Sequence, residues 1–456
     1  MVEGSQARMD GATIPSARSS ISFLRSPWTT LAIFVILMLL SFFDRQLLAL
    51  LLVPIQTDLG LSDVELGLVS GIAFTIFYCS VGLLLGWAVD RYPKRWLLFV
   101  GVVFWSAATM ACGLATSFPQ LFGARLLVGF GEAVVAPCAF SVLTSIFARH
   151  RLALVMSIFA GATNLGAAVI FIGGGAFIAF LNSRGPIELP ILGVLHPWQA
   201  SFILIGAPGA LFALLAFLIN DRPRSDQPLV PGANAGVSLL SFLRAHKKLL
   251  ILHTGAYTAA CMNAYTMIPW APAFLERTYQ LDIFRVGLVV GVSNGLCGFL
   301  GNVFWGFMAD RQIKRGRVGS LYTVYTIAQS LGVVSALTTL LVHNVIVSVI
   351  GLCVSWASLF SSGGLNSAYG LITPAHLRGR IGALNSFVMS SFALGLTPLI
   401  VGLVTELVYH DRAKVGASIA TVIVVCTTVS ITLLQLARRP LQEAVARAEI
   451  ETSSAA

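Results

Sequence analysis

The sequence predicts an all-α integral membrane protein in which twelve transmembrane helices form two pseudo-symmetric six-helix bundles. Three observations predict this fold class. They are a very apolar composition, the placement of positive charges between the apolar runs, and a motif that occurs once in each half of the chain.

The composition excludes a soluble globule. Of the 456 residues, 57% are hydrophobic and only 11% are charged, whereas a soluble protein carries about 25% charged residues. The remaining apolar surface must therefore face membrane lipids. The net charge of +10 does not indicate a nucleic-acid partner, because the basic residues lie between apolar runs rather than on one face.

Apolar runs bounded by charged residues or by Pro and Gly give twelve candidate helices. They lie near residues 29–53, 65–89, 96–116, 119–146, 152–181, 199–219, 249–275, 284–309, 319–342, 344–373, 379–408 and 415–437. The predicted organisation is an N-terminal tail (1–28), a first six-helix bundle (29–219), a linker (220–248), a second six-helix bundle (249–437) and a C-terminal tail (438–456).

The distribution of Lys and Arg predicts the orientation. If both termini lie on one side, that side holds 22 of the 29 Lys and Arg residues and the opposite side holds 5. Positively charged loops stay in the cytoplasm, so we expect cytoplasmic termini and a location in a bacterial-type inner membrane. An odd number of helices would destroy this asymmetry.

One motif occurs in both halves. The residues after the second predicted helix read Gly86-x-x-x-Asp90-Arg91-x-x-Lys94-Arg95, and those after the eighth read Gly306-x-x-x-Asp310-Arg311-x-x-Lys314-Arg315, at a constant offset of 220. Such a recurrence indicates a duplicated six-helix unit, the arrangement that many secondary transporters use for alternating access.

The repeated motif resembles the signature of the major facilitator superfamily, and the resemblance covers the whole chain. Three further segments resemble its spinster-like branch of lipid transporters: Phe43-Asp44-Arg45, Arg125 to Ala133 (RLLVGFGEA), and Trp270 to Leu275 (WAPAFL). The resemblance implies a monomeric, proton-coupled transporter of lysophospholipids or sphingosine-phosphate-like molecules, with no bound cofactor.

The repeated motif also has a physical interpretation. Gly86 and Gly306 allow neighbouring helices to approach closely, and Asp90 and Asp310 can meet the positive N-terminus of a neighbouring helix. In the family these loops latch the cytoplasmic side when the outer side is open. The cations expected to face the cytoplasm are Arg91, Arg95, Arg311 and Arg315. The alternative is a topological anchor without a gating role.

Four charged residues lie well inside the predicted helices: Asp44, Arg45, Arg125 and Glu132. Each unpaired charge at mid-helix costs about 2.5–3.5 kcal/mol, so partners are expected. Arg125 and Glu132 are seven residues apart and share a helix face. Asp44 and Arg125 should differ in depth by about 5 Å.

We therefore expect Asp44 to pair with Arg125 and to be protonated and deprotonated during transport, with Glu132 as a second proton carrier. Arg45, turned by about 100° from Asp44, is expected to bind substrate or to extend toward water. The alternative is a pair of permanently ionised groups that stabilise helix packing.

Other polar or aromatic side chains are weaker candidates for the transport path. The candidates for cavity lining are Tyr257, Asn263, Asn294 and Trp356. The alternative, which these residue types favour, is hydrogen bonding between helices, or ordinary core packing for Trp356. The pattern Gly291-x-Ser293-x-Gly295 fits a hydrolase elbow, but it lies within an apolar helix and is not expected to be catalytic.

No phosphate-binding G-x-x-x-x-G-K-[ST] loop is present, so ATP is not expected to drive transport. The seven scattered cysteines suggest neither a metal site nor a disulfide framework. The leading interpretation is a proton-coupled secondary transporter of an amphipathic lipid. A transporter of a small organic anion or drug-like compound is the alternative, and a channel or receptor is a remote one.

Overall fold

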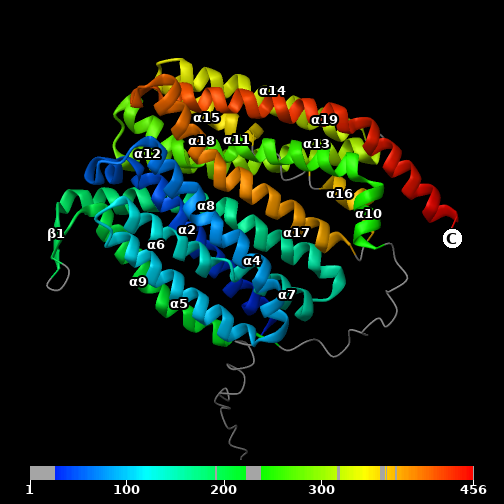
Figure 1. Ribbon diagram of the computed structural model, residues 1–456, viewed down its shortest axis with the longest axis horizontal. Coiled ribbons are helices and arrows are strands. Elements are labelled where there is room, and N and C mark those ends of the chain that lie inside the picture. Colours follow the sequence, from blue (N-terminus) through cyan, green and yellow to red (C-terminus); the bar gives the residue numbers. More distant parts are fainter. Residues whose placement is uncertain are drawn as a thin grey trace, which may run out of the picture.

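A computed structural model describes residues 26–189, 193–221, 238–315, 319–359, 365, 367–374 and 377–454. The described chain is a bundle of long, roughly parallel and antiparallel helices (Figure 1). Of its four hydrophobic clusters, one lies wholly in the first half and two lie wholly in the second. The fourth joins residues of both halves, so the two halves share one core region.

The first half contains six membrane-crossing stretches and one hairpin. Its elements are α2 (Pro27–Leu59), α3 (Asp63–Gly67), η1 (Leu68–Ile72), α4 (Ala73–Arg91), α5 (Lys94–Gly113), α6 (Phe118–Glu132), α7 (Val135–Ile146), α8 (Arg149–Arg184), β1 (Ile187–Leu189), β2 (Gly193–Leu195), α9 (Pro197–Ala213) and η2 (Leu214–Leu218).

The second half repeats this arrangement without a hairpin among its described residues. Its elements are α10 (Leu239–Ala245), α11 (Lys247–Tyr279), α12 (Ile283–Val290), η4 (Gly291–Cys297), α13 (Gly298–Lys314), α14 (Ser320–Leu341), α15 (Val345–Leu359), α16 (Ser367–Ile372), α17 (Arg378–Met389), η6 (Ser390–Leu396), α18 (Thr397–Leu403), η7 (Val404–Tyr409), η8 (Arg412–Lys414) and α19 (Val415–Ser454).

The predicted membrane fold is confirmed. Within the described residues, ten helices are long and apolar enough to cross a membrane, and α15 is a shorter apolar helix. The twelfth stretch is α11, whose 33 residues include polar side chains that face the other helices.

Three local features differ from the sequence prediction. A two-stranded antiparallel hairpin pairs Ile187 with Leu195 between the fifth and sixth stretches. The linker contains α10, which is capped by Ser238. The last helix continues past the predicted end at 437 to Ser454, although Pro440 lies inside it, because Leu441 and Ala444 pack in the core of the second half. The rest of the linker, 222–237, lies outside the described residues.

Local sequence explains several helix ends. Ser26 caps α2 by accepting a hydrogen bond from Trp28, and Gly60 ends that helix with a φ of 66°, a conformation that favours glycine. Ser62 and Glu65 form a reciprocal capping box at α3. Asp282 caps α12. These ends define the turns between the first and second stretches and between the seventh and eighth.

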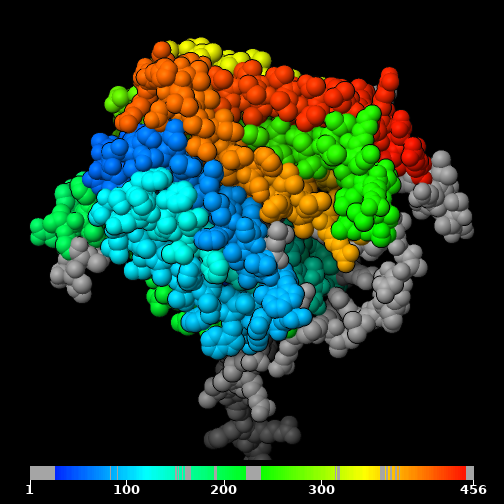
Figure 2. Space-filling view, viewed as in Figure 1, coloured from blue at the N-terminus to red at the C-terminus, as the bar shows by residue number. Residues whose placement is uncertain are grey.

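Three contact regions hold the two halves together. In the first, α2 packs against α11. In the second, α4 and η1 pack against η6 and α18, and in the third, α8 packs against α12 and η4. The third region uses glycines for close contact, since a Cβ on Gly291 or Gly295 would clash with α8 at Ile172 or Ala168. The hydrolase-like pattern is therefore a helix-packing surface. In Figure 2 the orange segment of the second half lies directly against the blue segment of the first.

Polar contacts link the two halves at one end of the bundle, here called the hairpin end because β1 and β2 lie there. At this end Arg277 Nη2 is 2.7 Å from Asp63 Oδ1, and Gln56 Oε1 accepts a second hydrogen bond of 2.7 Å from the same nitrogen. Glu406 accepts a hydrogen bond from Val64 N, and Arg412 donates to Leu61 O. Polar links thus close the hairpin end.

The opposite end, here called the loop end, carries the two repeated motifs. A Cβ placed on Gly86 or Gly306 would have no atom within 4 Å. Neither glycine is therefore in close contact with another helix. The bundle is closed at the hairpin end, whereas at the loop end no atom of the described residues occupies the space beside the two motif glycines.

Candidate functional site

A buried ion pair joins the first and fourth membrane-crossing stretches. Arg125 Nη1 in α6 is 2.6 Å from Asp44 Oδ2 in α2, and the two side chains are 1% and 3% exposed. The predicted pairing of Asp44 with Arg125 is confirmed. Because two charges at this depth are costly unless paired, the contact fixes α2 against α6.

A second ion pair lies beside the first. Arg45 Nη2 is 3.0 Å from Glu132 Oε2. Ser41, one turn before Arg45, donates a hydrogen bond of 2.6 Å to the same carboxylate oxygen and accepts one of 2.8 Å from Arg45. This pairing of Arg45 was not predicted from the sequence, which indicated that Arg45 binds substrate or extends toward water.

Aromatic rings surround the Arg45 guanidinium. Its central carbon lies 4.7 Å from the ring centre of Phe42, 4.8 Å from that of Phe74 and 5.4 Å from that of Tyr78. A cation attracted to ring faces is held in place without a further carboxylate. This aromatic cage therefore orients Arg45 while leaving it able to exchange its anionic partner.

Each of the four charged side chains retains one buried polar atom without a hydrogen-bond partner among the described residues. These atoms are Asp44 Oδ1, Arg45 Nε, Arg125 Nε and Glu132 Oε1. Buried polar atoms are normally hydrogen-bonded. The two free carboxylate oxygens are thus positions at which a proton can be added without breaking an existing hydrogen bond.

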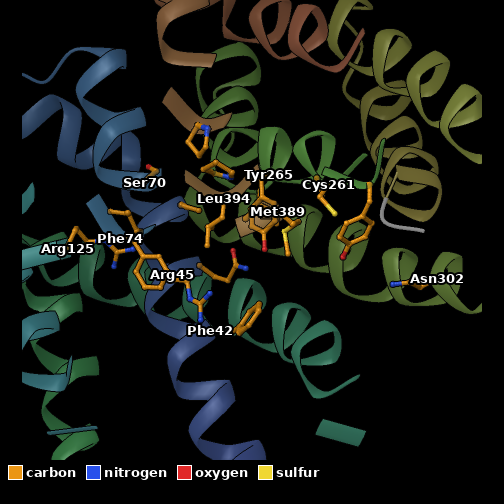
Figure 3. Close-up of a pocket in the computed structure, with 18 residues that line it drawn as sticks. Phe42, Arg45, Ser70, Phe74, Arg125, Cys261, Tyr265, Asn302, Met389 and Leu394 are labelled. Carbon is orange, nitrogen blue, oxygen red and sulfur yellow. The ribbon is translucent and has the colours of Figure 1, made fainter. Parts of the chain in front are cut away.

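A cavity of about 260 Å³ lies between the two halves next to these pairs. Figure 3 shows Phe42 and Arg45 on one side of it and Tyr265 and Cys261 of α11 on the other. Most of its wall is apolar. The polar side chains that reach it are Arg45, Gln46, Ser70, Arg125, Tyr257, Tyr265 and Asn302. Among these lining residues, both cations come from the first half.

The four candidate cavity residues divide into two groups. Tyr257 lines the cavity. Asn263 is instead buried between helices and donates a hydrogen bond to Thr427. Asn294 lies in η4, and Trp356 is fully buried in the joint core. These three side chains do not reach the cavity, because helix rotation turns them toward neighbouring helices.

Several cavity residues are not among the candidates predicted from the sequence. Gln46 and Asn302 interrupt apolar runs in the same way as the four charges do, so a search for every polar residue at mid-helix would have found them. Nothing in the sequence marked Phe42 and Phe74 as cavity residues, because aromatic residues are common in apolar helices.

The repeated motifs lie at the loop end. Arg91, Asp310, Arg311 and Arg315 are exposed, and Arg95 is half-buried. Lys94 is 3.5 Å from Asp221 at the end of the sixth stretch. The side chain of Asp90 lies outside the described part of the chain, so its expected contact with a helix N-terminus is not described.

Comparison with known proteins agrees with this architecture. Residues 34–398 match the Major Facilitator Superfamily. The chain is 26% identical over 391 residues to an MFS-type efflux pump of Mycolicibacterium smegmatis, covering 85% of this chain and 86% of the relative. It is 24% identical over 432 residues to a probable L-galactonate transporter of Escherichia coli, covering 89% and 88%.

Spinster proteins are also similar. The chain is 24% identical over 318 residues to protein spinster of Drosophila melanogaster, covering 67% of this chain and 49% of that protein. A bacterial homologue of the human lysosomal transporter Spinster, solved in an inward-facing and unoccupied conformation, has the same fold. Its TM-score is 0.74 at 20% identity, over 94% of this chain and 98% of that one.

The family match covers most of the chain, and the architecture is that of a multi-pass membrane bundle. The chain therefore belongs to the Major Facilitator Superfamily and is a membrane transporter rather than an enzyme.

Proposed function

We propose that this protein is a proton-coupled secondary transporter of an anionic amphipathic lipid, such as a lysophospholipid, that works by alternating access. The observation that carries the proposal is the position of Arg45. It lines the cavity while it is paired, on its other side, with the buried carboxylate of Glu132. The Glu132 carboxylate and a substrate anion can therefore compete for one guanidinium, and protonation of Glu132 favours the substrate.

The coupling step follows from charge balance. With Asp44 and Glu132 ionised, the four buried charges sum to zero and both arginines are paired. Protonation of Glu132 removes the negative charge beside Arg45, which then needs another anion. A phosphate or carboxylate in the cavity satisfies that need. Release of the substrate is followed by loss of the proton and return of the ion pair.

Asp44 and Arg125 are the second proton site in this proposal. Their pair is less exposed than that of Arg45 and Glu132, and Arg125 also reaches the cavity wall. Protonation of Asp44 would free Arg125 for the same anion. Glu132 is the proton carrier that acts first, because its partner is the more exposed arginine.

The chemistry of the cavity supports an amphipathic substrate. The cations lie on one side, and most of the remaining wall is carbon. A highly hydroxylated solute would leave its hydroxyl groups without partners against such a wall. An acyl chain fills it at a gain of about 0.8 kcal/mol per buried methylene group.

A small organic anion is the second candidate. Relatives named as transporters of L-galactonate and of hexuronate support it, as does the modest cavity volume of about 260 Å³. Such an anion would use the same two arginines. We further propose a monomer with both termini and the repeated motifs on the cytoplasmic side, two six-helix bundles at 29–219 and 249–437, and no cofactor other than the coupled proton.

Transport in proteoliposomes with an imposed pH gradient tests the proposal. Wild-type protein is expected to move a lysophospholipid faster with the gradient than without it. Glu132→Gln and Asp44→Asn are expected to abolish the stimulation by the gradient, whereas Glu188→Gln, a substitution on the exposed hairpin, leaves it intact. Galactonate in the same assay tests the second candidate. If a gradient drives galactonate but no lysophospholipid, the lipid proposal is wrong.

A further inference from the structure

A second hollow lies on the outer surface of the first half, away from the transport cavity. It encloses about 500 Å³ between α4, α5 and α6. Its wall includes Leu85, Tyr92, Trp96, Val100, Phe104 and Phe130. Val100 and Trp96 are 59% and 57% exposed, so the groove is open on the face that the membrane surrounds. We call it the leaflet groove.

The leaflet groove does not lead to the transport cavity. No residue lines both. Its floor is sealed where α5 meets α6, because a Cβ on Gly101 would clash with Val134 and would lie 3.1 Å from Gly131 O. A molecule in the groove is therefore outside the transport path.

The length of the groove corresponds to one leaflet. Its lining residues within α5 run from Trp96 to Phe104, eight residues with a rise of about 12 Å. Tyr92 and Pro93, just before α5, extend the groove toward the loop end. Half of a hydrocarbon core about 30 Å thick is about 15 Å. The groove thus runs from the membrane surface at the loop end to the middle of the bilayer, which is the depth occupied by one acyl chain.

Positive charge lies at the surface end of the groove. The Arg91 guanidinium lies 4.4 Å from the ring centre of Trp87, and Trp87 contacts Tyr92 edge-on. Tyr92 in turn lines the groove. Arg95 precedes the lining residue Trp96, and its buried Nε has no hydrogen-bond partner within the described chain. Lys94 is already paired with Asp221.

We propose that the leaflet groove binds one acyl chain of an anionic phospholipid of the adjacent leaflet, with its head group at Arg91 and Arg95. The carbon wall accepts the chain, and the two guanidinium groups complement a phosphate that carries net negative charge. The bound lipid would sit on the first repeated motif and is distinct from any transported lipid, so this inference does not rest on the proposed function.

Native mass spectrometry of the full-length protein released from nanodiscs tests the inference, with nanodiscs made of equal parts phosphatidylglycerol and phosphatidylcholine. Wild-type protein is expected to retain phosphatidylglycerol. Val100→Trp fills the groove and should reduce retention about tenfold, the equivalent of about 1.4 kcal/mol. Ile346→Trp, at a position 69% exposed on α15, is the matched control and should retain the lipid.

Charge substitutions test the head-group site. Arg91→Gln is expected to lower retention about fivefold, since one cation near an anionic membrane contributes about 1 kcal/mol. Arg311→Gln, at the matching position of the second motif, should have no effect. Gel filtration shows whether each variant is folded.

Three results would overturn the proposal: undiminished retention in folded Val100→Trp, equal retention of phosphatidylcholine by the wild type, or a wild-type dimer that Val100→Trp converts to a monomer. The last result would mean that a second copy of the chain, rather than a lipid, covers the groove.

Discussion

Arg45 and Glu132 form an ion pair in which only the arginine reaches the cavity. Their closest nitrogen and oxygen are 3.0 Å apart, and the side chains are 15% and 0% exposed respectively. Any effect of protonation at Glu132 on a substrate must therefore pass through Arg45. This relationship gives the first prediction.

Arg45→Lys is expected to raise the KM for the anionic substrate about tenfold while the protein remains folded. Lysine keeps the charge, but it loses the planar group that lies among Phe42, Phe74 and Tyr78 and that places Nη2 against both Ser41 and Glu132. Initial transport rates over a range of substrate concentrations measure the effect. An unchanged KM would show that the substrate does not contact Arg45.

The pair of Asp44 and Arg125 is expected to stabilise the first half. Asp44→Asn and Arg125→Met each leave a buried charge without its partner, at a cost of about 3–5 kcal/mol. The double variant Asp44→Asn/Arg125→Met should lose less than the sum of the two single losses, because it leaves no unpaired charge. Thermal unfolding of the purified protein measures all three. Strictly additive losses would contradict direct pairing.

The latch proposed for the loop end predicts that bulk at two glycines stops transport without loss of stability. Gly86 and Gly306 have open space around them in this conformation, so valine fits. If the opposite conformation packs these glycines closely, Gly86→Val and Gly306→Val should prevent it. Transport is expected to fall at least about tenfold with an unchanged unfolding temperature. Gly82→Val, which also has open space, is the control and should transport normally.

The polar links at the hairpin end predict that weakening one of them makes local unfolding of this end more frequent. Asp63→Asn weakens the contact with Arg277, a charge-assisted hydrogen bond worth about 1.5–3 kcal/mol. Hydrogen exchange in the segment 56–66 is then expected to be at least about tenfold faster. Asp282→Asn breaks an exposed pair with Arg285 within the second half and should leave exchange in that segment unchanged. Equal exchange in wild type and Asp63→Asn would show that the ion pair does not hold this end closed.

Most of the fold could be predicted because membrane insertion imposes simple rules on the sequence. Apolar runs, the excess of Lys and Arg on one side, and the 220-residue repeat depend only on local composition and order. The extent of α19 was predicted less well. Its final turns are polar enough to resemble a tail, and their helical state depends on the packing of Leu441 and Ala444 in the second half.

The candidate site was predicted in part. The depths of Asp44 and Arg125 in the membrane could be estimated from their spacing to the ends of their helices. Because these depths are similar, the sequence predicted that the two residues pair. The partner of Arg45 depends on the rotation of α2 against α6 and on Ser41, which lies one turn before it. Helix rotation is set by packing between stretches far apart in the sequence. For the same reason the sequence could not decide between cavity lining and helix packing for Asn263, Asn294 and Trp356, which the structure buries between helices.

The distribution of buried charge has a consequence for biogenesis. Within the described residues, the fully buried Asp, Glu and Arg side chains all belong to the first half: Asp44, Asp63, Arg125 and Glu132. Helix α2 carries Asp44 and Arg45 into the membrane before their partners on α6 have been synthesised. A nascent chain that stops before α6 exposes both groups to lipid. The first four membrane-crossing stretches are therefore the shortest N-terminal segment in which each charged residue near the cavity has its ion-pair partner. Cellular quality control should therefore recognise and degrade nascent chains that are shorter than this segment.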